Sequence, residues 1–233
     1  MDSKMTRDQV VQSILDLFID PEYLEIGVNK GETFGKINCH RKVAVDPNFL
    51  FDKNIWAEEM NNAEFHEVTS DVYFESCDEK FDLIYLDGLH TFEQTLRDFC
   101  NAISCLKPGG AILIDDTIPN SYHAAMPDLQ RSFQIRRARN DKSGSWMGDV
   151  YRLVYFIDNF FQQWTLATLV ENHGQTLVWQ NSRPASEIPN NKVSVIASLP
   201  YEEVYLNKRP YRRMLISDII KDISSNLENK RPV

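Results

Sequence analysis

The sequence predicts an α/β fold: a doubly wound, mostly parallel sheet of seven strands, with an antiparallel hairpin at one edge and helices on both faces. Through residues 6–116, short apolar segments alternate with helical patterns, as in parallel sheets whose crossover connections are helices. Within residues 164–180, two further apolar segments flank a short turn, which is typical of a hairpin. We expect one domain over residues 1–233, because this length suits a single large α/β domain.

The predicted parallel strands lie in the first half of the chain. They follow an N-terminal helix at residues 6–19, within the segment 1–20, whose apolar residues recur at helical spacing up to Asp20-Pro21. A short helix is expected after Gly31. One strand is nearly continuous in apolar residues, as expected of a parallel strand buried on both faces. The predicted strands are residues 23–27, 42–46, 63–70, 80–87 (the continuous one) and 110–116.

The second half of the chain combines helices, the hairpin and a polar segment. A helical stripe of apolar residues runs through 92–106 and ends at the sequence KPGG (107–110). Residues 119–150 are polar, so we expect an irregular substrate lid that includes Trp146 and Met147, with solvated arginines. The remaining predicted elements are a helix at 149–160, two strands within 164–180 joined at 172–174, and a closing helix at 211–228.

The composition argues against several classes of protein. The net charge is -9, which disfavours a nucleic-acid partner because such proteins usually display a basic surface. The four cysteines show neither a CxxC pair nor zinc-finger spacing, so we expect reduced thiols. No apolar segment approaches the roughly 20 residues that span a bilayer, and the N-terminus lacks the pattern of a signal peptide. We therefore expect a soluble, cytoplasmic protein with no membrane partner, and we leave a homodimer open.

The ends of the first two strands predict a nucleoside cofactor. The first strand runs into Gly27 and Gly31, and glycines let a backbone approach a ligand closely. The second strand ends in Asp46, 19 residues after Gly27. A carboxylate at about this spacing after the glycine can accept both hydroxyl protons of a ribose. Asn29 interrupts the dinucleotide motif GxGxxG, which disfavours an NAD-linked oxidoreductase. The alternative is a tight strand-to-helix turn with no ligand.

These residues resemble the class I S-adenosylmethionine-dependent methyltransferases. The match runs from about Tyr23 to Asp116 and includes the sequences EIGVNKG, FDLIYLDGLH and LKPGGAILIDD. It is most similar to the methyltransferase 24 group, which is related to catechol-type and macrolide-sugar O-methyltransferases. The resemblance implies a Rossmann-like domain that binds S-adenosylmethionine. The residues that it places at the cofactor are Glu25, Gly27, Asn29, Lys30, Gly31, Asp46, Ser70, Asp71 and Asp87.

The resemblance also implies a metal site and a general base. In metal-dependent relatives, oxygen ligands follow the fourth and fifth strands, which matches Asp87, Asp115 and Asp116 here. Three such carboxylates would repel one another unless a cation or protons neutralise them, and a hard ion such as Mg²⁺ suits oxygen ligands. Asp87 is also expected to act in catalysis, with His90 as general base, although the catechol-type relatives have a lysine at that position. The alternatives are an Asp87 that only contacts substrate, aspartates that cap the next turn, and a His90 that orients a carboxylate.

The predicted function is methyl transfer from S-adenosylmethionine to a small hydroxylated acceptor, with Mg²⁺ or another divalent cation as a second cofactor. Two alternatives stay open: a metal-independent N- or O-methyltransferase, and a non-catalytic protein that binds the cofactor as a partner subunit. The sequence does not distinguish sugar, phenol, polyketide or amino-acid hydroxyls as the acceptor. The other four histidines, His173 among them, show no pattern that suggests a role.

Overall fold

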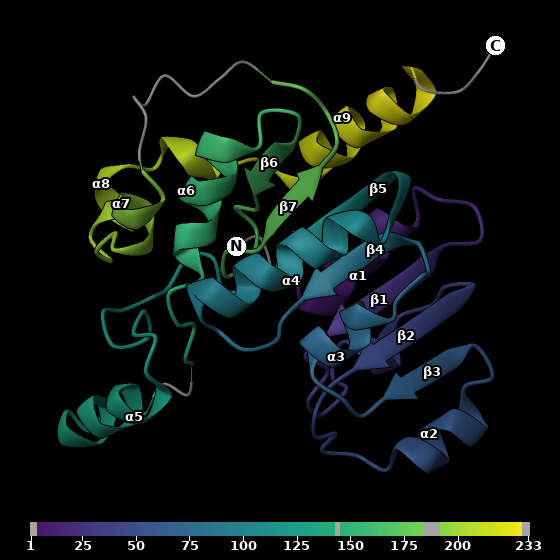
Figure 1. The fold of residues 1–233 in the computed structure, drawn as a ribbon, viewed down its shortest axis with the longest axis horizontal. Helices are drawn as coiled ribbons and strands as arrows, with labels where there is room; N and C mark the ends of the chain where they lie inside the picture. The colour runs from purple at the N-terminus through teal and green to yellow at the C-terminus, as the bar shows by residue number, and fades with distance from the viewer. Residues whose placement is uncertain (1–3, 143–144, 184–191, 230–233) are drawn as a thin grey trace.

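The computed structural model describes residues 4–142, 145–183 and 192–229, and within them the predicted fold is confirmed. Its seven-stranded sheet has the order β3-β2-β1-β4-β5-β7-β6 (Figure 1). All neighbouring strands from β3 to β5 pair in parallel, whereas β7 is antiparallel to both β5 and β6. The strands are β1 (Glu22–Ile26), β2 (Arg41–Val45), β3 (Ala63–His66), β4 (Phe81–Leu86), β5 (Leu106–Ile114), β6 (Thr165–Thr168) and β7 (Thr176–Trp179).

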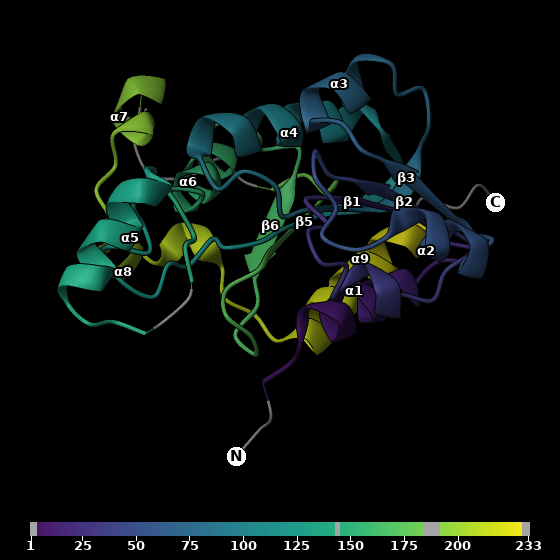
Figure 2. The same cartoon turned by 90° about the horizontal axis from the view of Figure 1, so that it is seen from below.

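Helices cover both faces of the sheet (Figure 2). One face carries α3, α4 and α6, and the other carries α1, α2 and α9. The α-helices are α1 (Arg7–Leu15), α2 (Lys53–Glu59), α3 (Ser70–Glu75), α4 (Phe92–Ser104), α5 (Leu129–Ala138), α6 (Tyr151–Phe160), α7 (Val193–Ala197), α8 (Glu203–Leu206) and α9 (Ile216–Asn229), and two short 3-10 helices are η1 (Phe34–Lys36) and η2 (Arg209–Tyr211).

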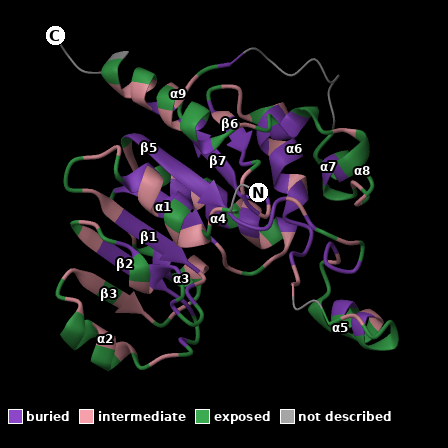
Figure 3. Cartoon of the chain, turned by 180° about the vertical axis from the view of Figure 1, so that it is seen from behind, coloured by how far each residue is buried: buried purple, intermediate pink, exposed green. Residues whose placement is uncertain are grey.

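Alternation of side chains along the strands builds two cores. Leu24 and Ile84 face the core beneath α4 and α6, whereas Tyr23 and Tyr85 face the core beneath α1 and α9. Successive residues of a strand point to opposite faces, so a central strand must be apolar at every position to serve both cores. Every residue of β4 is buried, and Figure 3 shows that burial is concentrated in the central strands.

Several helices differ from the sequence-based expectation. The helices α2, α3, α5, α7 and α8 were not predicted, and the one at 129–138 lies in the segment expected to be irregular. α2 buries none of its residues and α5 buries only Ser132 and Arg136. Neither therefore shows the apolar stripe that identifies a helix in a sequence. Their starts are capped by the side chains of Asp52 and Asp128. α5 lies away from the sheet (Figure 1).

Several boundaries also differ. The third predicted strand ends at His66 rather than at residue 70, where α3 begins, and the closing helix begins at Ile216 rather than at residue 211. α1 ends at Leu15 rather than at residue 19. The KPGG sequence does not lie in a loop, because β5 begins at Leu106 and includes it. Gly109 has a φ of +88°, and the pairing of β4 with β5 shifts register between Phe81 and Leu83. The glycine thus serves an irregular strand start, and α4 ends before it, with Cys105 as its C-cap. Among the described residues, no helix is long and apolar enough to cross a membrane.

Candidate active site

The carboxyl ends of β1 and β4 approach each other at Gly27. This residue has a φ of +88°, and a Cβ added to it would lie 2.1 Å from the carbonyl oxygen of Asp87. Backbone hydrogen bonds hold the approach: the amide of Gly27 donates to Val45 (2.9 Å) and that of Asp87 donates to Ile26 (2.8 Å). Only glycine fits this position, because a side chain would clash with backbone that cannot move aside.

Asp46 lies beside this turn with its carboxylate already oriented. Its Oδ2 accepts a hydrogen bond from the amide of Asn29 (2.8 Å), and its Oδ1 accepts one from the amide of Asn48 (2.8 Å). The residue is 8% exposed. Each carboxylate oxygen has a second lone pair, so the fixed carboxylate retains two acceptor positions for a ligand.

Two adjoining cavities lie along the carboxyl ends of β1, β2 and β4. One has a volume of about 680 Å³ and the other about 500 Å³. Arg7, Gly27, Asn29 and Asp87 line both. We call the larger the Asp46 cavity and the smaller the Glu25 cavity. Of the residues predicted at the cofactor, Asp46, Ser70 and Asp71 line only the Asp46 cavity, and Glu25 and Lys30 line only the Glu25 cavity.

Gly31 belongs to neither lining. Its φ is +74°, and a Cβ there would lie 2.5 Å from the ring of Trp56. The Trp56 ring also stacks on Phe51. The glycine therefore makes room for an aromatic cluster, and its predicted contact with a cofactor stays a prediction.

Asp87, Asp115 and Asp116 lie together beyond the ends of β4 and β5, as predicted, and we call them the acidic cluster. The guanidinium of Arg7, the first residue of α1, reaches all three. Its Nε forms an ion pair with Asp115 and lies 3.9 Å from Asp87 Oδ2, and its second terminal nitrogen lies 3.8 Å from Asp116 Oδ1. The sequence analysis missed Arg7, because nothing in an N-terminal helix pattern indicates a contact with the fourth and fifth strands.

Asp115 is the most fully paired member of the acidic cluster. His173 Nε2 lies 2.6 Å from its Oδ1, and the hydroxyl of Tyr85 donates to its Oδ2 (2.8 Å), which Arg7 also contacts. Burial alone would raise the pKa of Asp115, but the bonds and charges of His173 and Arg7 hold that pKa well below its usual range. His173 also has a role that its sequence context did not show.

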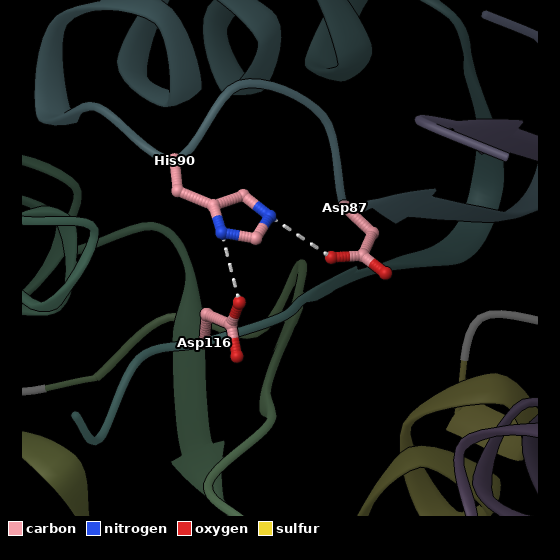
Figure 4. Close-up of side chains that lie close together, drawn as sticks. All are labelled: Asp87, His90 and Asp116. Carbon is pink, nitrogen blue, oxygen red and sulfur yellow. Dashed lines mark ion pairs between the residues drawn. The ribbon is translucent and has the colours of Figure 1, made fainter. Parts of the chain in front are cut away.

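His90 lies between the other two carboxylates (Figure 4). Its Nε2 is 3.4 Å from Asp87 Oδ1 and its Nδ1 is 3.0 Å from Asp116 Oδ2. Nδ1 also lies 2.7 Å from the carbonyl oxygen of Trp146, on whose ring His90 stacks. Burial disfavours the imidazolium, but hydrogen bonding to Asp87 and the charges of both carboxylates outweigh it and raise the pKa of His90 to about 9.

Burial and mutual repulsion act on the carboxylates themselves. Burial, with the charge of Asp115, raises the pKa of Asp87 to about 6 and that of Asp116 to about 7. Oxygen and imidazole donors of Asp87, His90 and Asp116 lie within 4.8 Å of one another, as do those of Asp115, Asp116 and His173. Both groups have the chemistry of ligands for a divalent cation.

Comparison with known proteins finds a family that matches part of the chain. The family Methyltransf_24, described as a methyltransferase domain, matches residues 24–117. The chain contains a methyltransferase domain. This confirms the predicted family, and the match covers nearly the same residues as the resemblance in the sequence. The chain is an S-adenosylmethionine-dependent methyltransferase. A search of curated protein sequences found no significant match.

Solved structures show the same fold at low sequence identity. A protein provisionally named a caffeoyl-CoA O-methyltransferase, from Staphylococcus aureus, has a TM-score of 0.54 and 16% identity, covering 76% of this chain and 85% of that one. The O-methyltransferase TomG from Streptomyces achromogenes, solved with S-adenosylmethionine, has a TM-score of 0.51 and 14% identity, covering 74% of this chain and 79% of that one. At 14% and 16% identity, these similarities show the fold alone.

Glu25 gives the methyltransferase a pH-dependent stability. Burial disfavours its carboxylate and the charge of Asp87 repels it, so its pKa rises to about 8 even though Tyr23 donates a hydrogen bond to it (2.6 Å). The folded protein therefore keeps a proton that the unfolded chain releases above about pH 4.5. The contribution of Glu25 to stability is therefore present below about pH 4.5 and is lost as the pH rises to about 8.

We expect Glu25→Gln to remove this part of the pH dependence, because glutamine resembles the protonated carboxyl. Urea unfolding from pH 5 to 8.5 should show the variant gaining on the wild type, by at most about 1.4 kcal/mol per pH unit. Glu32→Gln, at an exposed residue of the same cavity, is the control. Parallel stability curves for Glu25→Gln and the wild type would show that Glu25 is ionised in the folded protein.

Proposed function

We propose that this methyltransferase transfers the methyl group of S-adenosylmethionine to a hydroxyl oxygen of a small acceptor. The observation that carries the proposal is the adjacency of two features: Asp87 lines both cavities, and it belongs to the acidic cluster that flanks His90. A cofactor in the cavities would lie next to groups that can accept a proton. The names of the Staphylococcus and Streptomyces proteins also indicate O-methylation.

The two cavities suit the two parts of the cofactor. In our proposal the adenosine part binds in the Asp46 cavity, where Asp46 accepts both ribose hydroxyls and Ser70 and Asp71 border the adenine. The methionine part binds in the Glu25 cavity beside Glu25, Asn29 and Lys30. Gly27 lines both, so the backbone passes close to the middle of the cofactor. This cofactor has no phosphate, which agrees with the absence of GxGxxG from the sequence.

His90 is the proposed general base. The acceptor hydroxyl must lose its proton as the methyl group transfers, and a positioned base contributes about 10²–10⁴-fold to such a step. Asp87 and Asp116 hold the imidazole from both sides and stabilise the imidazolium that forms when it takes up the proton. The positive sulfonium of the bound cofactor opposes the imidazolium and so favours the neutral, proton-accepting form beforehand.

Mg²⁺ dependence is part of the proposal, with one condition. Two groups of side chains offer suitable ligands for the ion. One is Asp87, His90 and Asp116, and the other is Asp115, Asp116 and His173. A bound ion would supply positive charge that acidifies an acceptor hydroxyl. However, Arg7 already brings a cation to all three carboxylates. A metal therefore fits the acidic cluster once Arg7 has moved away from it.

The function is tested by incubating the protein with S-adenosylmethionine that carries an isotopically labelled methyl group and a panel of hydroxylated sugars, phenols and amino acids. Mass spectrometry should find the label on an acceptor oxygen. Label on nitrogen would instead support the N-methyltransferase alternative. Tight cofactor binding without transfer to any acceptor would support the non-catalytic alternative.

Asp46→Ala should weaken S-adenosylmethionine binding at least tenfold. The substitution removes two hydrogen bonds to a charged group, each contributing at most about 1.5–3 kcal/mol. Asp46→Asn keeps the size and one acceptor oxygen, so it should show a smaller loss. Calorimetry measures both, with circular dichroism as the check on folding. A folded Asp46→Ala protein with wild-type affinity would remove Asp46 from the cofactor site.

His90→Ala should lower kcat by about 10²–10⁴-fold while cofactor binding stays within a factor of about three. His90→Gln can still form hydrogen bonds but cannot take up a proton, and it should lose a similar part of the rate. Single-turnover transfer and calorimetry provide the two readings. If the glutamine variant retains the wild-type rate, His90 only orients its neighbours.

Arg7→Gln should bind Mn²⁺, a spectroscopic substitute for Mg²⁺, at least tenfold more tightly than the wild type. Two charges 4 Å apart interact by about 4 kcal/mol at an effective dielectric constant of 20. Removing the charge of Arg7 therefore strongly favours the binding of another cation to the carboxylates. Electron paramagnetic resonance counts free Mn²⁺ without any acceptor. Lys36→Gln is the control, because Lys36 lines the same cavity but contacts Asp8 instead. Full turnover of the wild type in EDTA would reject the metal requirement and leave the metal-independent alternative.

A further inference from the structure

A third cavity, of about 410 Å³, lies on the β5 and hairpin side of the acidic cluster. Asp116 lines it. Arg7 lines it as well as the two cofactor cavities, and His173 lines it as well as the Glu25 cavity. A molecule in this cavity would therefore lie across the acidic cluster, Arg7 and His173 from the proposed cofactor site. We call it the Arg213 cavity, after a residue at its rim.

Two further cations line the Arg213 cavity. Lys4 comes from the segment before α1, and Arg213 comes from the segment between η2 and α9. Neither forms an ion pair within the part of the chain that the structure describes. The described lining contains a single carboxylate, that of Asp116, and it already faces Arg7 and His90. The protein as a whole carries a charge of -9, so this concentration of positive charge is a local departure.

The side chains of Lys4 and Arg213 are exposed, and backbone hydrogen bonds hold the residue next to each of them. The amide of Met5, next to Lys4, donates to the carbonyl of Glu171 (2.9 Å). Met214, next to Arg213, donates to Thr168 (3.1 Å) and accepts from Val170 (3.1 Å). Both cationic residues are thus attached to one stretch of backbone, residues 168–171, at the end of β6.

The nearest acidic side chain on that stretch is committed elsewhere. Glu171 Oε2 accepts a hydrogen bond from the amide of Ile216, at the start of α9. A carboxylate at a helix N-terminus is stabilised there by the unpaired amides. Glu171 therefore caps α9 and leaves Lys4 and Arg213 without a counter-ion from the hairpin.

The rest of the lining is mixed. Ile118, Met147 and Tyr205 offer apolar surface, and Asn120 and Ser145 form a hydrogen-bonded pair (2.9 Å). In a cavity with apolar walls, a few polar groups and unpaired positive charges, those charges favour ligands that carry a negative charge.

We propose that the Arg213 cavity binds the methyl acceptor through an anionic group, a carboxylate or a phosphate ester, held by Lys4 and Arg213. The acceptor is then a hydroxylated organic anion whose hydroxyl points to the acidic cluster; this last point rests on the proposed function. Anion binding itself requires no methyl transfer, so it is measured separately.

The test compares matched probes that differ only in charge. In the carboxylate arm, 3,4-dihydroxybenzoate is compared with its neutral methyl ester. In the phosphate arm, glucose 6-phosphate is compared with glucose. Calorimetry is done in saturating S-adenosylhomocysteine, which fills the cofactor cavities and prevents the probes from binding there. In at least one arm, the anionic probe should bind the wild type roughly tenfold more tightly than its neutral partner at low salt, and the difference should shrink at 0.5 M salt because exposed charges are screened.

The double variant Lys4→Gln/Arg213→Gln should lose most of this preference, to about twofold or less, while binding of the neutral probe changes little. The control Arg137→Gln/Lys221→Gln removes the same charge at exposed positions outside the three cavities and should keep the preference. The arm that responds identifies the anion as carboxylate or phosphate.

The proposal is overturned if anionic and neutral probes bind the wild type equally in both arms. It is also overturned if the two double variants show the same preference, since the attraction would then come from general charge. O-methylation of neutral acceptors only would reject this inference and leave the proposed function standing. Charge-selective binding without any methyl transfer would support anion binding in the Arg213 cavity and reject the proposed function.

Discussion

The neutralisation of three adjacent carboxylates is the constraint on which this site depends. Asp87, Asp115 and Asp116 are held together because β4 and β5 are neighbouring parallel strands, and parallel strands end at the same edge of a sheet. Burial makes their charge costly unless cations or protons balance it. Arg7 and His173 supply cations from distant parts of the chain. The charge balance therefore also attaches α1 and the β6–β7 hairpin to the central sheet.

The order of the strands explains why the hairpin contributes to the site. Because β7 runs antiparallel between β5 and β6, the turn that precedes it lies at the carboxyl end of β5. His173 in this turn consequently lies beside Asp115 (2.6 Å). A parallel strand in the same position would have placed its preceding connection at the opposite edge. The antiparallel insertion thus brings a histidine to the acidic cluster, where it lines both the Glu25 cavity and the Arg213 cavity.

Sequence reasoning predicted the central sheet and the residues that end its strands. Gly27 and Asp46 came from contiguous patterns, a glycine and a carboxylate that directly follow apolar strands, whereas Asp87 came from the family resemblance. The failures have physical causes. Arg7 and His173 reach the acidic cluster across 108 and 58 residues from Asp115, and no local pattern encodes such contacts. At Gly31 the absence of a side chain also makes room for Trp56, which local spacing does not reveal, and its contact with a cofactor stays a prediction.

The same long-range contacts connect the two sides of the site energetically. Arg7 lines all three cavities, so any ligand that moves its guanidinium changes the walls of both the cofactor and the acceptor cavities. A divalent cation would release Arg7 from the acidic cluster, and an acceptor anion would attract it from the other side. If an acceptor anion draws Arg7 away, fewer positive charges remain on the carboxylates, and Asp87 and Asp116 then hold a proton on His90 more strongly. A divalent cation in place of Arg7 would add positive charge and would instead disfavour that proton. The proton affinity of that imidazole therefore depends on the position of Arg7, so the first turn of the N-terminal helix is part of the electrostatics of the acidic cluster.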